Sequence, residues 1–292
     1  MKKTCKLLSA AVIIAAMISC GKQPASDNGG KPSTEEISLP QDPYPGSTDF
    51  RKKVLITDFT GAGCPFCPDM TKILRKVISN SAYKESTILT IAHTFKKDGD
   101  PAYLNSSLPS VMGIKSYPTL IFDLRKEWAN GLTSLPDANS LQTQLDIQIK
   151  RNPALAGICT ASVIKDGNVT IKAGVKSGAE KATDYYVGIL VLEDGIKAEQ
   201  ANAPDPSYNI HNDCIRMIEG CSQKNFAGTR LDNILKKGES GEITFSFSLD
   251  KNIVKSNCKY VAYVSCAGED GNFKVVNAIS AQFGEPAKYQ YN

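Results

Sequence analysis

Two cysteines three residues apart are the strongest chemical signal in the sequence. Cys64 and Cys67 directly follow an apolar, β-branched run, residues 54–60, which predicts a buried strand, and apolar residues then recur at helical spacing. A cysteine at the start of a helix faces unpaired backbone N–H groups and the positive end of the helix dipole, which stabilise a thiolate. The spacing therefore predicts thiol-disulfide chemistry, with Cys64 as the attacking thiol and Cys67, one helical turn deeper, as the resolving thiol.

Two other interpretations of the CxxC compete with redox chemistry. Half of a zinc site would need about four ligands in all. The other cysteines are irregularly spaced, and His93 and His211 are the only histidines. We therefore expect neither a metal site nor another cofactor. A small structural disulfide without activity stays an alternative, because a lone CxxC is a weak signal.

The surrounding region, residues 51–149, resembles the thioredoxin superfamily at several independent points. Asp58 lies six residues before the first cysteine, and Tyr117-Pro118-Thr119 lies in a segment similar to the family's proline loop. The resemblance implies that Asp58 relays the proton of the resolving cysteine. It also implies that Pro118 is cis and packs against the redox pair, and that Tyr117 and Thr119 border the substrate. A simple turn is the alternative interpretation of Tyr117-Pro118.

His93 ends a run, residues 87–93, that predicts a second strand. Alignment with the thioredoxin superfamily places His93 where the family has a lysine near the buried aspartate. A histidine beside Asp58 is expected to share its proton near neutral pH. A histidine that faces solvent at the end of its strand is the alternative.

Three departures from the thioredoxin pattern surround the cysteines. Gly63 replaces the usual tryptophan, Pro68 replaces a basic residue, and Pro65-Phe66 replaces Gly-Pro between the cysteines. Pro65 suits a first helical turn, because its missing N–H would have no helical partner. Gly63 is expected to leave the approach to Cys64 unhindered. These departures leave the direction of electron flow open.

The N-terminal residues predict export and anchoring. Residues 1–19 combine early lysines with a short apolar core, as in a signal peptide, and Cys20 follows it as in the lipobox of bacterial lipoproteins. The resemblance implies that Cys20 is acylated and holds the protein on a membrane of the cell envelope, most simply the outer membrane. Residues 20–48 are rich in Gly, Pro, Ser and charge, which predicts a flexible tether. The formal net charge of +4 is too small to indicate a nucleic-acid partner.

The remaining chain predicts two domains: an α/β thioredoxin-like domain, residues 49–151, followed by a mainly antiparallel β-sandwich, residues 152–292. Asp166-Gly167 predicts a hairpin turn in the second domain. Six strand-like runs occur there, at residues 158–164, 168–175, 185–193, 242–249, 259–266 and 273–281.

The whole arrangement is similar to a family of outer-membrane lipoproteins named for a twenty-eight-kilodalton member, and His211-Asn212 and Arg216 carry this resemblance in the C-terminal half. Five further cysteines form an odd set in a chain predicted to be exported: Cys159, Cys214, Cys221, Cys258 and Cys266. We expect Cys214 to pair with Cys221, because both fall in one irregular segment. His211 near Cys214 is more simply structural than catalytic.

Three functions follow from these features. The leading one is an envelope thiol-disulfide oxidoreductase that acts on exported proteins containing cysteine. Its alternative is a surface-exposed lipoprotein that serves as a binding or adhesion module, with the thioredoxin fold as scaffold. A purely structural envelope component has no positive signal in the sequence. Asp58, Cys64, Cys67 and Pro118 together favour the oxidoreductase.

Overall fold

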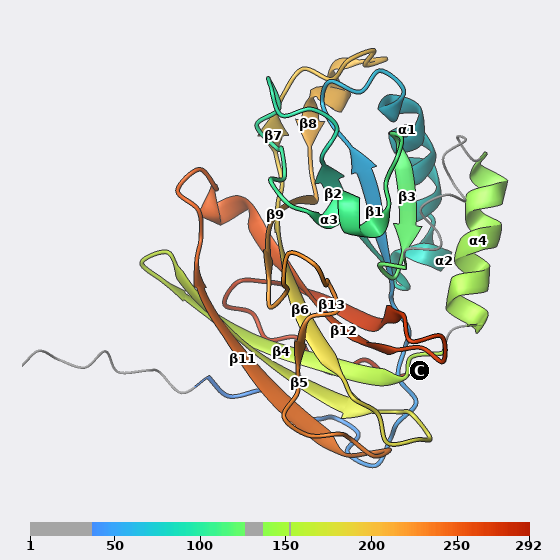
Figure 1. The fold of residues 1–292 in the computed structure, drawn as a ribbon, viewed down its shortest axis with the longest axis vertical. Helices are drawn as coiled ribbons and strands as arrows, with labels where there is room; N and C mark the ends of the chain where they lie inside the picture. Colours follow the sequence, from blue (N-terminus) through green and yellow to red (C-terminus); the bar gives the residue numbers. More distant parts are fainter. Residues whose placement is uncertain (1–36, 126–136, 152) are drawn as a thin grey trace, which may run out of the picture. The chain divides into compact units, whose positions relative to one another are not determined.

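One mixed sheet of eight strands runs through both halves of the chain (Figure 1). The computed structural model describes residues 37–125, 137–151 and 153–292, so the predicted signal peptide and the predicted lipidation site, Cys20, lie outside it. The sheet has the order β13-β12-β6-β9-β2-β1-β3, with β10 paired to β6. The strands are β1 (Val54–Thr60), β2 (Thr87–His93), β3 (Thr119–Phe122), β6 (Tyr186–Glu193), β9 (Cys214–Glu219), β10 (Thr229–Arg230), β12 (Cys258–Ala267) and β13 (Phe273–Gln282).

We call residues 37–151 the first half of the chain and residues 153–292 the second half. The first half places two longer helices beside three buried strands. β1 is parallel to β2 and antiparallel to β3, and every residue of β1 is buried, which explains its unbroken apolar run. Leu74 of α1 and Leu141 of α4 belong to one apolar cluster with Ile56 of β1. The helices are α1 (Cys67–Ile78), α2 (Ser81–Lys84), α3 (Leu108–Met112) and α4 (Ala138–Arg151).

The second half adds a three-stranded sheet, β11-β5-β4, made of β4 (Ala156–Lys165), β5 (Asn168–Ser177) and β11 (Ser240–Ser248). Its apolar side chains form one core with those of β6, β12 and β13. All six predicted strands are present, and Asp166 and Gly167 adopt positive φ angles of 51° and 82° at the predicted hairpin turn. The chain is therefore mostly β, with a mixed sheet and few helices.

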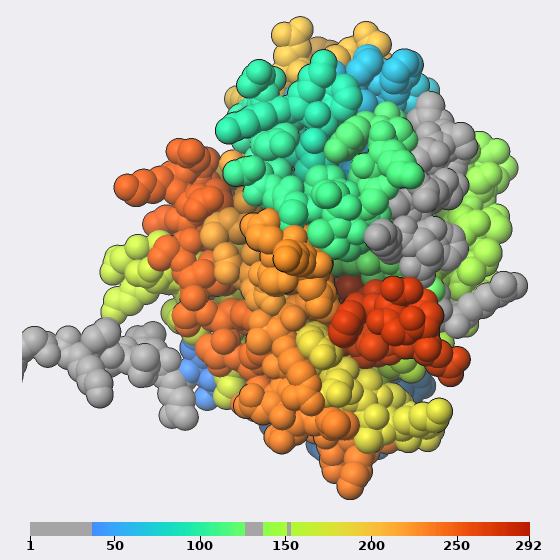
Figure 2. Space-filling view, in the orientation of Figure 1, coloured from blue at the N-terminus to red at the C-terminus, as the bar shows by residue number. Residues whose placement is uncertain are grey.

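The two halves join at one pairing within the large sheet. Ile91 of β2 is the parallel partner of Cys214 of β9, and the Ile91 N–H donates to the Asp213 carbonyl over 2.8 Å. Residues 37–292 form one compact unit, although the sequence predicts a boundary between residues 151 and 152. On the surface, the teal residues of the first half meet the orange segment that follows β9 (Figure 2). The predicted boundary therefore does not interrupt the sheet.

The last part of the predicted tether packs against the second half. Asp42 forms an ion pair with Lys176 at 2.9 Å and accepts a hydrogen bond from the Tyr291 hydroxyl. The Lys176 side chain is only 3% exposed, so its charge needs this partner. The prediction of a flexible tether over residues 20–48 is therefore wrong for residues 37–48. Composition alone could not show the buried lysine that Asp42 pairs with.

The expected Cys214–Cys221 disulfide is absent. Cys214 begins β9, which ends at Glu219, and the five steps of this strand span about 17 Å at roughly 3.3 Å each. The two residues from Glu219 to Cys221 are too few to bring the chain back to Cys214. A disulfide requires Cα atoms about 4.4–6.8 Å apart. Within the described ranges, all five of these cysteines are free: Cys159, Cys214, Cys221, Cys258 and Cys266. The segment that appeared irregular in the sequence is a strand, which explains the error.

Helices of the described residues are all too short or too polar to cross a membrane.

Candidate redox site

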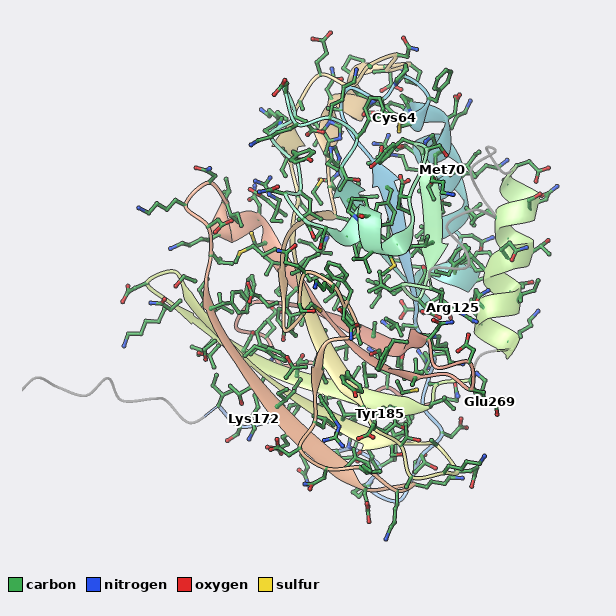
Figure 3. The ribbon with its side chains drawn as sticks, viewed as in Figure 1. Cys64, Met70, Arg125, Lys172, Tyr185 and Glu269 are labelled. Carbon is green, nitrogen blue, oxygen red and sulfur yellow. A yellow bond between two sulfur atoms is a disulfide. The ribbon has the colours of Figure 1, made fainter. Side chains whose placement is uncertain are left out.

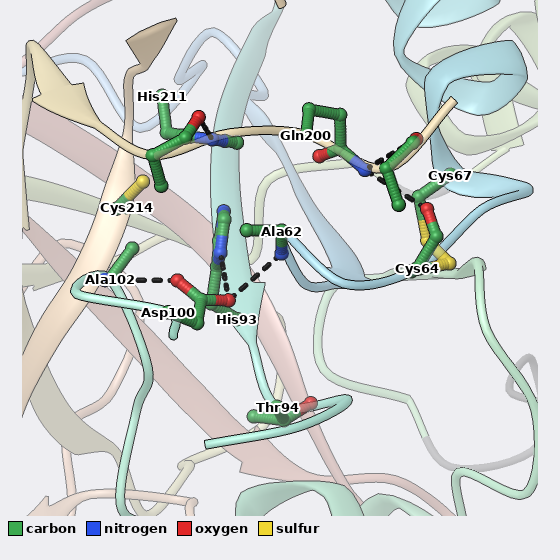
Figure 4. Close-up of polar contacts among 12 residues, drawn as sticks. Ala62, Cys64, Cys67, His93, Thr94, Asp100, Ala102, Gln200, His211 and Cys214 are labelled. Carbon is green, nitrogen blue, oxygen red and sulfur yellow. Dashed lines mark hydrogen bonds and ion pairs between the residues drawn. A yellow bond between two sulfur atoms is a disulfide. The ribbon is translucent and has the colours of Figure 1, made fainter. Parts of the chain in front are cut away.

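Cys64 and Cys67 form a disulfide between the end of β1 and the start of α1, with their Cα atoms 5.5 Å apart (Figure 4). Helix α1 begins at Cys67, so Pro68, rather than Pro65, occupies its first turn. The Cys67 N–H donates to the Cys64 carbonyl over 3.4 Å, which closes the intervening turn. Cys64 lies far from Tyr185, which belongs to the apolar core of the second half (Figure 3).

Both sulfur-bearing residues are buried in this closed arrangement. Cys64 and Cys67 are each 1% exposed, whereas Phe66 between them is 64% exposed. The expectation that Gly63 leaves Cys64 openly accessible is therefore wrong. Gly63 itself is exposed, but removing one side chain does not expose its neighbour when other parts of the fold cover it. An incoming thiol has to displace part of the structure to reach Cys64.

Asp58 is a buried carboxyl in the middle of β1. It is 1% exposed, and its Oδ1 atom has no hydrogen-bond partner in the described part of the chain. Loss of hydration upon burial raises the Asp58 pKa from 3.8 to about 7. This carboxyl is thus suited to exchange a proton at neutral pH.

His93 at the end of β2 bonds to Asp100 instead of Asp58. The His93 Nδ1 atom lies 2.8 Å from Asp100 Oδ2, and this carboxylate also accepts from the N–H groups of Ala62 and Ala102 (Figure 4). Burial opposes ionisation of Asp100, but the hydrogen bond and charge of His93, together with these N–H groups, lower its pKa. Asp100 thereby ties His93 to the loop that precedes Cys64, a link that sequence spacing does not reveal.

In the segment around Pro118, the side chains of Tyr117 and Thr119 are engaged in hydrogen bonds within the protein. The Tyr117–Pro118 peptide bond is cis, as expected. The Tyr117 hydroxyl donates to the Thr94 carbonyl over 3.1 Å, and the Thr119 hydroxyl donates to the Ser116 carbonyl over 2.7 Å. Thr119 is fully buried, so its side chain holds the turn and does not face solvent.

A loop from the second half, residues 200–202, directly contacts residues 61–66, the loop between β1 and α1 that we call the redox loop. The Gln200 Nε2 atom donates to the Cys64 carbonyl over 2.9 Å, and the Ala201 N–H donates to the Ala62 carbonyl over 2.8 Å. Asn202, with a positive φ of 56° that asparagine tolerates well, donates from Nδ2 to the Pro65 carbonyl over 3.3 Å. Sequence reasoning missed this loop, because no local pattern indicates contacts across about 136 residues.

A cavity of about 230 Å³, lined by both polar and apolar side chains, lies behind the redox loop. Asp58, Thr71 and His93 line it from the first half, and Gln200, Tyr208 and His211 line it from the second. The His93 and His211 rings meet edge to face, with centroids 4.7 Å apart. Burial, followed by the charge of His93, lowers the His211 pKa. The cavity therefore brings together Asp58 and His93, which make no hydrogen bond to each other.

The free thiols of the second half have inert surroundings. Burial raises the pKa of Cys159 and Cys221 to about 11 and that of Cys258 to about 12, and it raises the Cys214 pKa further. Thiolates are the reactive form, so these cysteines react slowly at neutral pH. Among the residues that the structure describes, no cluster of three or more ligating side chains could hold a metal ion.

The fold and this site define a mostly β protein whose mixed sheet carries a CxxC disulfide at one end. A family model for the outer membrane protein Omp28 matches residues 105–286, and the chain belongs to that family. Membership confirms the predicted location in the cell envelope, at the outer membrane. The matched residues begin after the CxxC, so the family itself assigns no redox chemistry.

Solved structures add a likeness in fold. HBP35 of Porphyromonas gingivalis matches with a TM-score of 0.66 and 20% identity, over 82% of this chain and 77% of that chain. Two structures of the β-glucosidase from Kluyveromyces marxianus match at 12% identity, over 46% and 57% of this chain and 14% and 19% of theirs. Their TM-scores of 0.23 and 0.22 are too low to carry an argument. A search of curated proteins finds no match.

Proposed function

We propose that this chain is a lipid-anchored thiol-disulfide oxidoreductase of the cell envelope that acts on exported proteins containing cysteine. The observation that carries this proposal is the Cys64–Cys67 disulfide, placed where a buried strand ends and a helix begins. The cis peptide before Pro118 and the buried carboxyl of Asp58 support it, because both accompany a CxxC in the thioredoxin-like pattern.

The reaction is thiol-disulfide exchange in two steps. In the reducing direction, the Cys64 thiolate attacks a client disulfide, forms a Cys64–client bond and releases one client thiolate, which takes up a proton. Cys67 then gives its proton to the Asp58 carboxylate and attacks Cys64 Sγ. The Cys64–Cys67 bond re-forms and the second client thiolate leaves. The client gains two electrons and the cysteine pair loses two; the oxidising direction is the reverse.

The cellular setting completes the proposal. Acylated Cys20 would anchor the chain, and the residues between Cys20 and Ile37 would serve as a tether. The thioredoxin-like region, residues 49–151, would carry the chemistry. His93 and Asp58 line the same cavity, where they would exchange a proton. Tyr117 would offer backbone groups to an extended client. The β-rich region that follows would position the redox region or its client.

A binding module is the second candidate function, and the burial of Cys64 favours it. A disulfide that is 1% exposed at each cysteine would persist as a structural bond if nothing opened the site. The fold would then act as a scaffold for surface recognition.

Trapping of clients distinguishes the two functions. In Cys67→Ser, attack by Cys64 proceeds but release does not, so mixed disulfides with other envelope proteins should accumulate. Non-reducing gels of the native host's envelope, followed by mass spectrometry, would show them. The matched control is the double variant Cys64→Ser/Cys67→Ser. If the single variant is folded and abundant yet traps no more than the double variant, the binding module is the better description.

Alkylation of the reduced protein tests the roles of the two cysteines. We expect a limiting amount of iodoacetamide at pH 7 to label Cys64 before Cys67, because the thioredoxin-like pattern makes the first cysteine the attacking thiol. Helix α1 begins at Cys67, so position at the helix start does not by itself decide between the two cysteines. Peptide mapping by mass spectrometry measures the ratio. The buried thiols, such as Cys159 with its pKa of about 11, provide an internal reference for unreactive cysteines. Preferential labelling of Cys67 would reverse the assigned roles.

A further inference from the structure

One segment of the second half covers part of the cavity behind the redox loop. We call residues 200–213 the roof segment; it contains the 3-10 helix η2 (Pro206–Asn209) and the short strand β8 (Ile210–His211), which pairs with β7 (Ile196–Lys197). It contributes much of the cavity lining opposite Asp58 and Thr71. The cavity is thus built jointly by two parts of the chain that are remote in sequence.

Two independent contacts hold the roof segment in place. At one end, Gln200, Ala201 and Asn202 bond to carbonyls of the redox loop, as described above. Further along, Tyr208 is buried beneath Arg75 of α1, whose guanidinium carbon lies 4.5 Å from the ring centroid. The same guanidinium donates to the hydroxyl and carbonyl oxygens of Ser207 over 3.4 Å. These contacts join the roof segment to both the redox loop and the redox helix.

Two residues that line the cavity carry buried polar atoms without a partner in the ranges that the structure describes. Asp58 Oδ1 and His93 Nε2 are buried and have no hydrogen-bond partner among the described residues. A space of about 230 Å³ with polar groups in its lining has room for several water molecules, each of which occupies about 30 Å³ in the liquid. Thr71 lines the same cavity, and its hydroxyl donates to the Cys67 carbonyl over 3.2 Å, so one hydrogen bond connects the cavity lining to the main chain of the resolving cysteine.

We propose that the roof segment is a working part of the redox site, which encloses the Asp58 cavity through Tyr208 and positions the Cys64 loop through Gln200. The second half of the chain would then govern both proton transfer at Asp58 and the freedom of Cys64 to react. This inference rests on the proposed oxidoreductase function. Gln200 and Tyr208 are positioning residues in this scheme.

The effect of the roof segment on Asp58 is separable from direct charge effects. Burial is the cause of the high Asp58 pKa, so admitting bulk water should lower it. The charged or titratable groups that share the cavity with Asp58 are Arg75, His93, Tyr208, His211 and Asp213. A substitution at Tyr208 that alters only the size of the side chain leaves the four other groups in place.

Tyr208→Ala tests the enclosing role. We expect the Asp58 titration midpoint, followed by the NMR signal of its carboxyl carbon in the oxidised protein, to fall by about one pH unit or more towards the ordinary value. Tyr208→Phe is the matched control, because it keeps the ring beneath Arg75 and should keep the wild-type midpoint. Asp58→Asn assigns the signal. A folded Tyr208→Ala protein with an unchanged midpoint would overturn the enclosing role.

Gln200→Met tests the positioning role, since methionine keeps the length of the side chain but cannot donate to the Cys64 carbonyl. We expect dithiothreitol to reduce the Cys64–Cys67 disulfide several-fold faster. Gln282→Met, at an exposed position on β13, is the control. An unchanged reduction rate would overturn the positioning role. Both measurements are independent of client trapping, so a failure of the proposed function and a failure of this inference give different results.

Discussion

Replacing Asp58 with asparagine should stabilise the folded protein by up to about 4 kcal/mol above pH 7. The reason is that burial raises the Asp58 pKa from 3.8 to about 7, and each pKa unit corresponds to about 1.4 kcal/mol. The folded state keeps its proton while the unfolded state loses it, so wild-type stability falls as pH rises from about 4 to about 7. Urea unfolding of both proteins at pH 4 and pH 8 measures the effect.

The same substitution should damage catalysis while it improves stability. Removing a positioned acid–base group typically slows its step by about 10²- to 10⁴-fold, so Asp58→Asn should slow release of a mixed disulfide trapped on Cys64. Asp98→Asn, in an exposed loop, controls for the loss of a carboxylate. Equal stability of Asp58→Asn and wild type at pH 8, or an unchanged release rate, would contradict the role given to the buried carboxyl.

Removing the amine of Lys52 should destabilise the protein by about 3–5 kcal/mol, because it leaves a buried carboxylate without its charged partner. Lys52 Nζ lies 2.9 Å from Asp123 Oδ2, and the two side chains are 5% and 3% exposed. Lys52 also donates to the Val275 carbonyl, and the Val275 N–H donates to the Asp123 carbonyl over 2.9 Å. The pair therefore joins the first half to β13. Urea unfolding of Lys52→Met measures the loss.

Two further variants make this test specific. Lys150→Met breaks an ion pair with Asp146 whose side chains are 74% and 47% exposed, and it should cost no more than about 0.5 kcal/mol. Lys52→Met/Asp123→Asn removes both buried charges but keeps an acceptor for the Leu55 N–H, so it should regain most of the loss. A Lys52→Met protein as stable as Lys150→Met would show that the pair contributes little.

Local features of this chain could be predicted from sequence. The buried strand before Cys64 and the helix after Cys67 follow from apolar spacing, and the cis peptide at Pro118 follows from a motif. The six strands of the second half follow from alternation and turn residues. In each case the determining residues are neighbours in the sequence, so their pattern reflects the local structure directly.

Contacts between distant segments could not be predicted in this way. The carboxylate that orients His93 is Asp100, in a link without regular pattern, and Gln200 approaches Cys64 from the other half of the chain. Whether β2 is an edge strand or pairs with β9 depends on tertiary packing, which the sequence of neither strand reveals. The same limitation explains the mistaken pairing of Cys214 with Cys221, since a strand without alternating polarity resembles a loop.

All three hydrogen bonds that residues 200–202 donate to the loop around Cys64 end on main-chain carbonyls, those of Ala62, Cys64 and Pro65. Every amino acid presents such a carbonyl, so these bonds place no demand on the side chains between the two cysteines. Substitutions at Pro65 and Phe66 would therefore leave these three hydrogen bonds intact. We therefore expect substitutions at Pro65 and Phe66 to be tolerated by this contact, whereas substitutions at Gln200 should not be.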